Sequence, residues 1–436
     1  MTTTDEVVAV GEAVALADGP AAVASPTVVV IGLGYIGLPT AAVLASHGID
    51  VVGVDINPNT VAAVNAGRAP FVEPDLERAV SDAVERGSLC AEAEPPPADC
   101  YIIAVPTPFK AEHRPDLSYV EAASDAIAGR LSGGELVVLE STSPPGTTQL
   151  VADRIMIARP DLSMDGSNGR PQVHFAHAPE RVLPGRIMHE LVANDRIVGG
   201  LTPVAAERAR DLYASFCDGA ILLTDALTAE MSKLVENSYR DVNIAFANEL
   251  SLICDRLGVD VWELIELANH HPRVDILQPG PGVGGHCIAV DPWFVVAADP
   301  KHSRLIRTAR EINDAKPSHV VEKVVAAAVG IANPRIACFG LTFKPDVDDM
   351  RESPAVMVVE GVRQRLPEAH IDIVEPHIER LPTKLNGKAN LVDVESALEN
   401  VDIVVLLVDH APFRTISVRT RVAPTVSVID TRGLWT

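Results

Sequence analysis

The chain has 436 residues, of which 47% are hydrophobic and 22% charged, and its formal net charge is −23. This length predicts two or three domains, and this composition excludes a disordered chain. The negative charge argues against nucleic acid or an anionic membrane as a partner, and no apolar run reaches the roughly 18 residues of a membrane span.

Residues 1–25 are rich in Ala and Val, are acidic and lack the basic start of a signal peptide, so we expect a flexible N-terminal extension. The cysteines form no CxxC pair, which argues against a zinc site or a disulfide framework and favours a reducing cytoplasm. We expect no metal. Five cysteines lie in apolar surroundings and are predicted to be buried, namely Cys90, Cys100, Cys217, Cys254 and Cys338.

The first motif combines a strand, a glycine turn, a helix and a second strand. Residues 27–31 form a β-branched run, Gly32-Leu-Gly-Tyr-Ile-Gly37 follows, residues 39–46 are helical, and residues 50–54 form a strand that ends at Asp55. This order is the one that a dinucleotide-binding fingerprint requires.

Each glycine of this fingerprint, and the acid that follows it, is required for a physical reason. Gly32 allows the tight turn, Gly34 lets a pyrophosphate approach the backbone, and Gly37 permits close packing of the helix on the strand. The helix N-terminus offers free N–H groups to the phosphates. Asp55 would accept hydrogen bonds from the ribose and repel a 2′-phosphate, which favours NAD over NADP.

Further strands are predicted at residues 101–105, 136–139, 173–176 and 196–199. Alternation with helices predicts a mostly parallel sheet covered on both faces, and we assign residues 26–215 to an NAD-binding Rossmann domain. Thr107 and Thr142 follow two of these strands, at the sheet edge where ligands bind, so they are candidate cofactor contacts. Alternatively, Thr and Pro only shape the turns there.

The middle of the chain, residues 216–329, is predicted to be a helical dimerisation and catalytic domain. A long helix covers residues 228–257, a capping box at Asp260 opens a second helix, and a third covers residues 303–329 with an interruption at Pro317. Lys233, Asn237 and Arg240 form one polar stripe on the long helix. Such a stripe is either a solvated face or a source of oxyanion stabilisation.

Cys287 lies in the glycine-rich run Pro281-Gly-Val-Gly-Gly-His-Cys-Ile-Ala-Val-Asp291. A thiol framed by glycines is easily reached by a substrate, whereas a cysteine in a structural turn is the alternative. With a nicotinamide cofactor, the thiol suggests an oxidation that passes through a covalent thiohemiacetal. Asp291, four residues later, is a candidate to orient Lys233 or a hydrolytic water.

A second α/β unit, residues 330–436, has predicted strands at residues 335–340, 370–374, 401–408 and 427–430. The predicted fold class is therefore α/β, with two Rossmann-like, doubly wound parallel-sheet domains joined by a central helical region that contains a long helix. Four basic residues fit a diphosphate, since Arg gives bidentate contacts and Lys a point charge. They are Arg181, Arg273, Lys344 and Arg351, and Phe343 directly precedes Lys344.

Taken together, these motifs resemble the UDP-glucose/GDP-mannose dehydrogenase family across residues 27–435. The resemblance rests on residues 30–40, 179–185 and 236–250, and above all on residues 271–292. It implies NAD-dependent, two-step oxidation of a sugar C6 hydroxyl to a carboxylate. The His-Cys form of the cysteine loop is similar to that of members acting on UDP-N-acetyl-D-mannosamine, whereas UDP-glucose dehydrogenases usually carry Gly-Phe-Gly-Gly-Ser-Cys.

The resemblance also implies roles for individual residues. Cys287 would be the nucleophile and Lys233 the catalytic lysine, helped by Asn237 and Asp291. Cofactor contacts would be Gly32, Gly34, Tyr35, Ile36, Gly37, Asp55, Thr107, Thr142 and Arg351. Contacts to the UDP-sugar would be Glu180, Arg181, Val182, Lys233, Asn237, Arg240, His271, Arg273, Gly284, Phe343 and Lys344. The arginine matching Arg273 reaches the neighbouring subunit's site in the family, which implies a homodimer through the central helices.

Three positions depart from the family's usual residues. Pro184 replaces an acid of UDP-glucose dehydrogenases and leaves Glu180 as the nearby carboxylate, Thr60 replaces an arginine, and Arg432 stands where a lysine is common. The alternatives are the same chemistry on UDP-GlcNAc, UDP-glucose or GDP-mannose, a one-step NAD-linked hydroxyacid dehydrogenase, and a non-catalytic NAD-sensing or scaffold protein.

Overall fold

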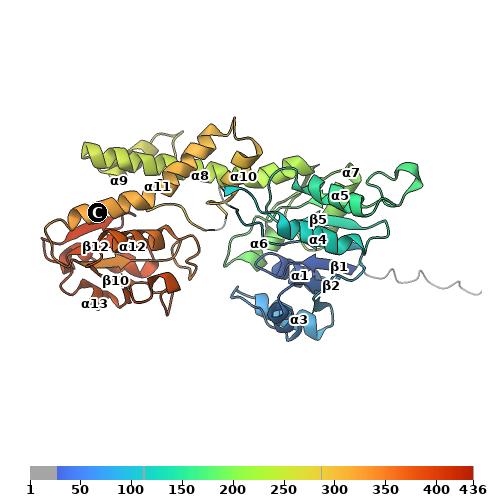
Figure 1. Cartoon of the computed structure of the whole chain (residues 1–436), viewed down its shortest axis with the longest axis horizontal. Coiled ribbons are helices and arrows are strands. Elements are labelled where there is room, and N and C mark those ends of the chain that lie inside the picture. Colours follow the sequence, from blue (N-terminus) through green and yellow to red (C-terminus); the bar gives the residue numbers. More distant parts are fainter. Residues whose placement is uncertain (1–26, 111–112, 286, 436) are drawn as a thin grey trace, which may run out of the picture.

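The computed structural model describes residues 27–110, 113–285 and 287–435. Figure 1 shows two α/β lobes side by side, with a layer of long helices running across both of them. The predicted extension at residues 1–25 lies outside the described residues. Within the described chain, no helix is at once long enough and apolar enough to cross a membrane.

The N-terminal lobe is built on an eight-stranded sheet of order β3-β2-β1-β4-β5-β6-β7-β8, in which only the pairing of β6 with β7 is antiparallel. The first six strands have the order of a dinucleotide-binding Rossmann fold. The strands are β1 (Thr27–Ile31), β2 (Asp50–Val54), β3 (Leu89–Glu92), β4 (Cys100–Ile103), β5 (Leu136–Leu139), β6 (His174–His177), β7 (Arg196–Gly200) and β8 (Ile221–Asp225).

Helices cover both faces of this sheet because its central strands are apolar on both sides. Along β1, Val28 and Val30 belong to one core, whereas Val29 and Ile31 belong to the core on the other face. The helices of this lobe are α1 (Gly37–Ser46), α2 (Pro58–Asn65), α3 (Leu76–Glu85), α4 (Ser118–Ala128), α5 (Thr147–Ala158), α6 (Ile187–Ala193) and α7 (Pro203–Tyr213), with a 3₁₀ turn at Ser167–Gly169.

The layer across the top of Figure 1 consists of α8 (Ala226–Leu257), α9 (Val261–Asn269), α10 (Asp291–Ala298) and α11 (Arg304–Ala327). The Asp225 side chain caps the first turn of α8, and Gly258, at φ 71°, ends the helix. Asp260 caps α9 by accepting the N–H groups of Trp262 and Glu263, as its capping motif predicts. The predicted interruption at Pro317 is wrong, because α11 continues through this buried proline.

The C-terminal lobe has a five-stranded, fully parallel sheet of order β11-β10-β9-β12-β13. Its strands are β9 (Arg335–Phe339), β10 (His370–Val374), β11 (Asn390–Leu391), β12 (Ile403–Leu406) and β13 (Ser427–Asp430). Its helices are α12 (Pro354–Arg365), α13 (Val394–Leu398) and α14 (Val418–Arg421), with 3₁₀ turns at Thr383–Leu385 and Ala411–Thr415. The predicted fold class of two doubly wound lobes and a long central helix is confirmed.

The first turn of the C-terminal lobe repeats that of the N-terminal lobe. Gly32 donates its N–H to Val54 O at 2.8 Å, and Gly340 donates to Val374 O at 2.9 Å. The following N–H donates to the acid after the second strand, Leu33 to Asp55 at 2.9 Å and Leu341 to Glu375 at 2.7 Å. In both lobes, the turn after the first strand is therefore held by a hydrogen bond to the acid that follows the second strand, as in nucleotide-binding folds.

Candidate active site

The glycine turn between β1 and α1 has room for a pyrophosphate. Gly32 has φ +94°, and a Cβ there would lie 2.6 Å from Ala104 O. A Cβ on Gly37 would lie 1.9 Å from Gly32 O, so this position holds α1 tightly against the turn. A Cβ on Gly34, in contrast, would meet no atom within 4 Å. The open space lies at the position where the fingerprint predicts the phosphates, and so the turn fits NAD.

This difference predicts opposite outcomes for two alanine substitutions. Gly34→Ala is expected to fold normally and to weaken NAD binding at least about tenfold, since its methyl group occupies the space that the pyrophosphate needs. Gly37→Ala is expected to lower the thermal unfolding midpoint, because its methyl group clashes with backbone. Calorimetric titration with NAD and thermal unfolding of both variants check this. Unchanged NAD affinity in Gly34→Ala would contradict it.

The loops after β4 and β5 are tied to each other and to α8. The Thr107 hydroxyl donates to Thr142 O at 2.5 Å. Glu230, buried on α8, accepts the N–H of Gly146 at 2.5 Å and of Thr148 at 2.7 Å, at the N-terminus of α5. Glu230 is not among the predicted site residues, although it lies three residues before Lys233 on the same helix. It fixes the candidate cofactor loop to the helix that carries the candidate lysine.

Cys287, Asp291 and Asn237 meet where α10 begins. The N–H of Asp291 donates to Cys287 O at 2.8 Å, which closes one turn between the two residues. The Asn237 amide donates to Asp291 Oδ2 at 2.5 Å. Asp291 is 2% exposed, and Lys233, one turn before Asn237 on α8, is 8% exposed. Four of the predicted residues are thus brought together from two segments that are about 50 positions apart.

Burial and charge act on this cluster in opposite directions. Burial raises the pKa of Asp291 to about 6, while the Lys233 charge and the Asn237 hydrogen bond hold it down. Solvent reaches Cys287, yet the surrounding protein limits hydration of a thiolate, so burial, together with Asp291, raises the pKa of this thiol. Lys233, Arg351 and Lys344 oppose that rise. The thiol is therefore protonated at neutral pH in the free protein.

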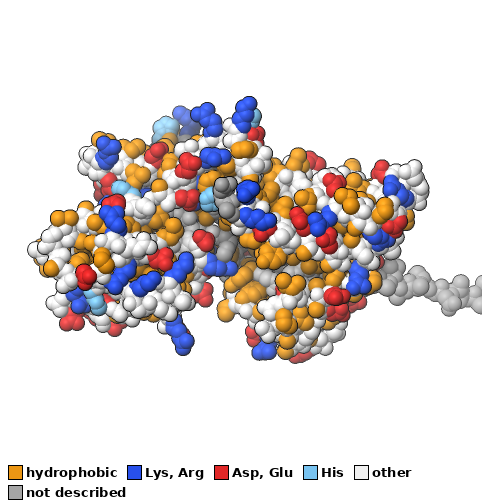
Figure 2. All heavy atoms as spheres, in the orientation of Figure 1, with side chains coloured by type: hydrophobic (Ala, Val, Ile, Leu, Met, Phe, Trp, Pro, Cys, Tyr) orange, Lys and Arg blue, Asp and Glu red, His pale blue; other side chains and the backbone are white. Residues whose placement is uncertain are grey.

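The C-terminal lobe closes against the cysteine loop. A Cβ on Gly284 would lie 2.3 Å from Glu352 O, and a Cβ on Gly285 would lie 2.9 Å from the Phe343 ring. Lys344 Nζ lies 5.6 Å from the Phe343 ring centroid. Only glycine permits this approach. Figure 2 shows the notch between the two lobes, with Lys and Arg side chains near its upper end.

Arg351 brings the second lobe to the glycine turn of the first. Its guanidinium carbon lies 5.0 Å from the centroid of the Tyr35 ring, and it forms a bidentate pair with Asp349. Tyr35 in turn stacks on Phe71 with a centroid distance of 4.3 Å. Arg351 is therefore placed next to the predicted cofactor turn although it belongs to the other lobe.

The residues predicted around position 180 have protein partners. Glu180 is buried and accepts from Arg196 Nη2 at 3.0 Å and from the Arg181 N–H at 2.7 Å. Arg181 forms a bidentate pair with Glu236 on α8, and Val182 packs against the core of the lobe. Both Glu180 oxygens are thus engaged in holding this loop. Arg240, His271 and Arg273 are exposed.

Cysteine burial differs from expectation at two positions. Cys100, Cys254 and Cys338 are buried, but Cys217 is half-buried and Cys90 is exposed. Cys90 faces outward because β3 alternates between buried and exposed residues. All six cysteines are free thiols.

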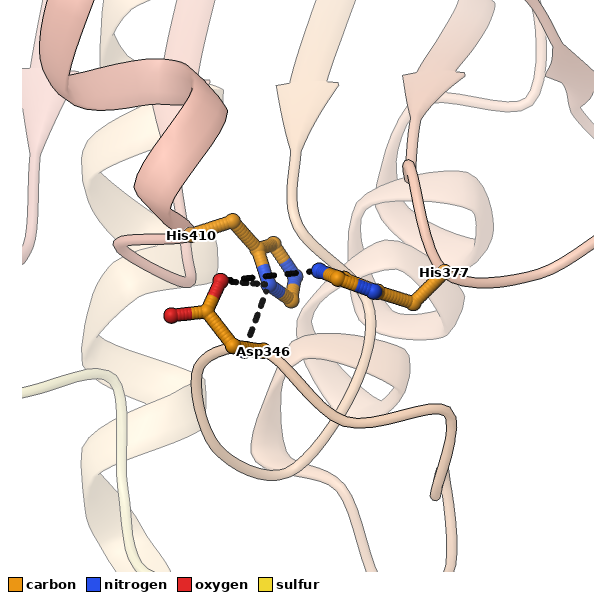
Figure 3. A group of neighbouring side chains, drawn as sticks. All are labelled: Asp346, His377 and His410. Atoms are coloured by element: carbon orange, nitrogen blue, oxygen red, sulfur yellow. Dashed lines mark hydrogen bonds and ion pairs between the residues drawn. The ribbon is translucent and has the colours of Figure 1, made fainter.

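A cluster of Asp346, His377 and His410 lies beyond the first turn of the C-terminal lobe, and Figure 3 shows these side chains turned toward one another. The donor atoms of the three lie within 4.8 Å of one another. However, His410 Nδ1 accepts the Asp346 N–H at 3.0 Å, and His410 Nε2 bonds with Glu375 at 2.9 Å. Because both ring nitrogens are engaged, the cluster locks the loop that carries Phe343 and Lys344, and we assign it no metal.

Comparison with known proteins supplies the context of this site. Models of the UDP-glucose/GDP-mannose dehydrogenase family match the chain in three parts, the NAD binding domain at residues 26–217, the central domain at 227–315 and the UDP binding domain at 337–436.

Among similar proteins, the NDP-N-acetyl-D-galactosaminuronic acid dehydrogenase of Ralstonia nicotianae is 58% identical over 94% of this chain and 96% of the relative. The UDP-N-acetyl-D-mannosamine dehydrogenase of Escherichia coli K12 is 52% identical over 94% and 99%. The structure of the UDP-D-ManNAc dehydrogenase of Pyrococcus horikoshii matches with a TM-score of 0.81 and 38% identity over 94% of this chain and 96% of that one.

Proposed function

Since the chain belongs to the UDP-glucose/GDP-mannose dehydrogenase family of NAD-dependent enzymes, we propose that it oxidises the C6 hydroxyl of UDP-N-acetyl-D-mannosamine to a carboxylate in two steps. The observation that carries the proposal is the cluster of Cys287, Asp291, Asn237 and buried Lys233 between the two nucleotide folds. The product would be UDP-N-acetyl-D-mannosaminuronate.

In this reaction the Gly32–Gly37 turn would hold the pyrophosphate of NAD and Asp55 its ribose, and the bound cofactor would supply the hydride acceptor for both oxidations. Cys287 adds to the C6 aldehyde and forms a thiohemiacetal, which the second oxidation converts to a thioester. Water then releases the carboxylic acid and restores the thiol. One alcohol, two NAD and one water thus yield one carboxylate, two NADH and three protons.

The surrounding residues have separate tasks. Lys233 stabilises the negative oxygen of the thiohemiacetal and of the adduct of water with the thioester. Asp291, with a pKa of about 6, is mostly ionised at neutral pH and can take a proton from the thiol or from the water. The Asn237 amide holds the Asp291 carboxylate in place. Phe343, Lys344, Arg273 and Arg181 would hold the UDP group.

The ratio of NADH formed to sugar consumed tests the reaction type. A nucleotide-sugar 6-dehydrogenase with a cysteine nucleophile is expected to give two NADH per sugar and no free aldehyde. A ratio of one that stops at the aldehyde would overturn the two-step chemistry and favour a one-step NAD-linked dehydrogenase.

The sugar itself needs a separate comparison, because the name of the Ralstonia relative refers to N-acetyl-D-galactosaminuronic acid, a galacto-configured sugar. A UDP-N-acetyl-D-galactosamine substrate is therefore the second candidate. The candidate substrates are distinguished by their kcat/KM values, measured side by side with NAD in excess. The sugars compared are UDP-ManNAc, UDP-GalNAc, UDP-GlcNAc, UDP-glucose and GDP-mannose. A kcat/KM for any other sugar that exceeds the value for UDP-ManNAc would displace our assignment.

We further propose that α8 forms a homodimer interface. Five exposed apolar side chains on α8 fall within about 40° of the helix circumference at 100° per residue, and these are Val235, Tyr239, Phe246, Ile253 and Leu257. Lys233 and Asn237 face the opposite side of the helix. Tyr239 is 72% exposed and Phe246 52%. A stripe of this kind on a single chain is typical of a protein–protein contact.

Placing a charge in this stripe is expected to separate the subunits. Tyr239→Glu should convert a dimer into a monomer, because an ionised carboxylate loses its hydration at the interface. Light scattering after size exclusion measures the mass. Ile157→Glu is the matched control, since Ile157 is 82% exposed on α5, away from the stripe. A wild-type protein that is monomeric at micromolar concentration would contradict the proposal.

A further inference from the structure

The loop that carries Cys287 has no regular secondary structure to hold it in place. Its described residues, between α9 and α10, form no helix or strand. Within the described chain, residues 275–285 make no hydrogen bond from backbone to backbone. Buried backbone N–H groups need partners, so side chains of neighbouring elements have to supply them. The position of the thiol therefore depends on a few side-chain contacts.

One of these contacts comes from Asn248 on α8. Its side chain is fully buried, and its Oδ1 accepts the N–H of Gly280, which precedes Cys287 in the loop, at 2.9 Å. Asn248 lies about three helical turns after Asn237, on the same face of α8. One face of this helix thus holds the Asp291 carboxylate with one asparagine and the backbone of the cysteine loop with another.

The orientation of Asn248 is fixed by a chain of buried hydrogen bonds. Its Nδ2 donates to Asn313 Oδ1 at 2.8 Å, and Asn313 Nδ2 donates to Asp241 Oδ1 at 2.8 Å. The same carboxylate oxygen accepts from Arg310 Nη1 at 2.6 Å. A carboxylate paired with an arginine only accepts, and the Gly280 N–H only donates, so neither amide can turn over without losing its hydrogen bonds. None of the four side chains is more than 1% exposed.

The C-terminal lobe and α11 hold the other side of the same stretch. A Cβ on Gly280 would lie 2.7 Å from Arg432 Nη1. A Cβ on Gly282 would lie 3.0 Å from Pro354 of α12 and 3.1 Å from Pro317 of α11. These contacts limit movement of the loop toward the C-terminal lobe, and the amide on α8 resists movement away from that helix.

We infer that Asn248 is a positioning residue, which sets the place of the Cys287 thiol relative to Lys233 on the same helix. The catalytic consequence rests on the two-step oxidation proposed above. When the loop shifts, the first hydride transfer still takes place, but the thiol adds to the aldehyde more slowly. A displacement of about 1 Å costs up to roughly 10²-fold in a step that needs close approach. Part of the aldehyde then leaves the site after one NADH has formed.

Asn248→Leu tests this, because it removes both amide hydrogen bonds with a side chain of similar size. We expect acid formation to slow at least about tenfold and free aldehyde to appear, so that more than two NADH form per acid. Trapping with semicarbazide and chromatography measure the aldehyde. Ser251→Ala is the matched control, since it removes another buried hydrogen bond between α8 and α11, the one from Lys316, and leaves the Gly280 contact intact. It should keep the ratio of two, and equal aldehyde release by both variants would overturn the inference.

Thiol labelling does not depend on the reaction, so it separates a failure of this inference from a failure of the proposed function. Iodoacetamide treatment and peptide mass spectrometry compare Cys287 with the exposed Cys90 in the same sample. Burial raises the pKa of Cys287, and a released loop lets water hydrate its thiolate. In Asn248→Leu, Cys287 should therefore react at least about threefold faster relative to Cys90 than in wild type. A relative rate equal to that of wild type would overturn the inference.

Hydrogen exchange in the wild-type protein gives a test that does not need a folded variant. The Gly280 amide is expected to exchange with deuterium at least about 10²-fold more slowly than a free amide, because Asn248 holds it. Mass spectrometry with single-residue resolution measures this rate. Exchange of the Gly280 amide at the rate of a free amide would show that the contact does not hold the loop, and the inference would fail.

Discussion

Cys287→Ala is expected to form no detectable acid, with a loss of at least about 10³-fold in the rate of carboxylate production. Without sulfur there is no thiohemiacetal, so the aldehyde has no covalent form that a second hydride transfer can act on. The NADH yield should fall from two per sugar to one or fewer. Chromatography of the sugar nucleotides together with NADH absorbance measures both quantities.

Cys90→Ala is the matched control, because Cys90 is an exposed free thiol on β3 and far from the Cys287 loop in sequence. This variant should keep the wild-type rate and the ratio of two. NAD affinity should be unchanged in both variants, since neither residue belongs to the glycine turn. Full acid production by Cys287→Ala would remove the thiol from the mechanism, because the second oxidation would then proceed without a covalent adduct.

The elements that the sequence predicts best are those where local pattern and burial agree. Strands β1, β2, β5, β10 and β13 have the predicted bounds, since short stretches rich in β-branched or other apolar residues are recognisable by themselves. In contrast, β3 and β8 were missed, because β3 alternates and β8 has three exposed residues at the sheet edge. An edge strand forms because it pairs with the neighbouring strand, and its own sequence pattern is weak.

The interruption predicted at Pro317 fails for a related reason. Proline removes one helical hydrogen bond, a cost of about 3 kcal/mol in an isolated helix. In α11 the residue is buried, and the helix is held on one side by α8 through Arg310, Asn313 and Lys316. On the other side, α11 packs on α12 of the C-terminal lobe. Tertiary contacts therefore override the local preference.

The site residues also divide into those that local sequence reveals and those that only tertiary packing brings together. The glycine turn and Asp55 lie within one short segment, so their spacing reveals them. Asn237 meets Asp291, 54 residues away, and Glu230 meets Gly146, 84 residues away. A lysine and an asparagine at positions 233 and 237 suggested oxyanion stabilisation. However, only the packing of α10 on α8 distinguishes a buried cluster from a solvated helix face. Arg196 and Lys316 gave no signal, because nothing in their local sequence indicates burial.

Lys233→Met is expected to lower kcat about 10²- to 10³-fold, with a smaller change in KM for the sugar, since it removes the positive charge that stabilises the oxyanions. It should also change the pH profile. Burial raises the pKa of Asp291 to about 6, and the Lys233 charge limits that rise. Asp291 acts as the carboxylate, so activity falls as the pH drops through its pKa. Without Lys233 this pKa rises, and the acid limb of kcat moves to higher pH.

The matched control for Lys233→Met is Lys344→Met, which removes a lysine from the proposed diphosphate contact. Lys344 is not among the groups that shift the pKa of Asp291. This variant should therefore raise KM for the UDP-sugar and leave the acid limb of kcat in place. Steady-state rates between pH 5 and pH 9 distinguish the two patterns. A Lys233→Met enzyme whose acid limb stays at the wild-type pH would show that the lysine charge does not reach Asp291 during turnover, and Lys233 would then lose its place in the proposed mechanism.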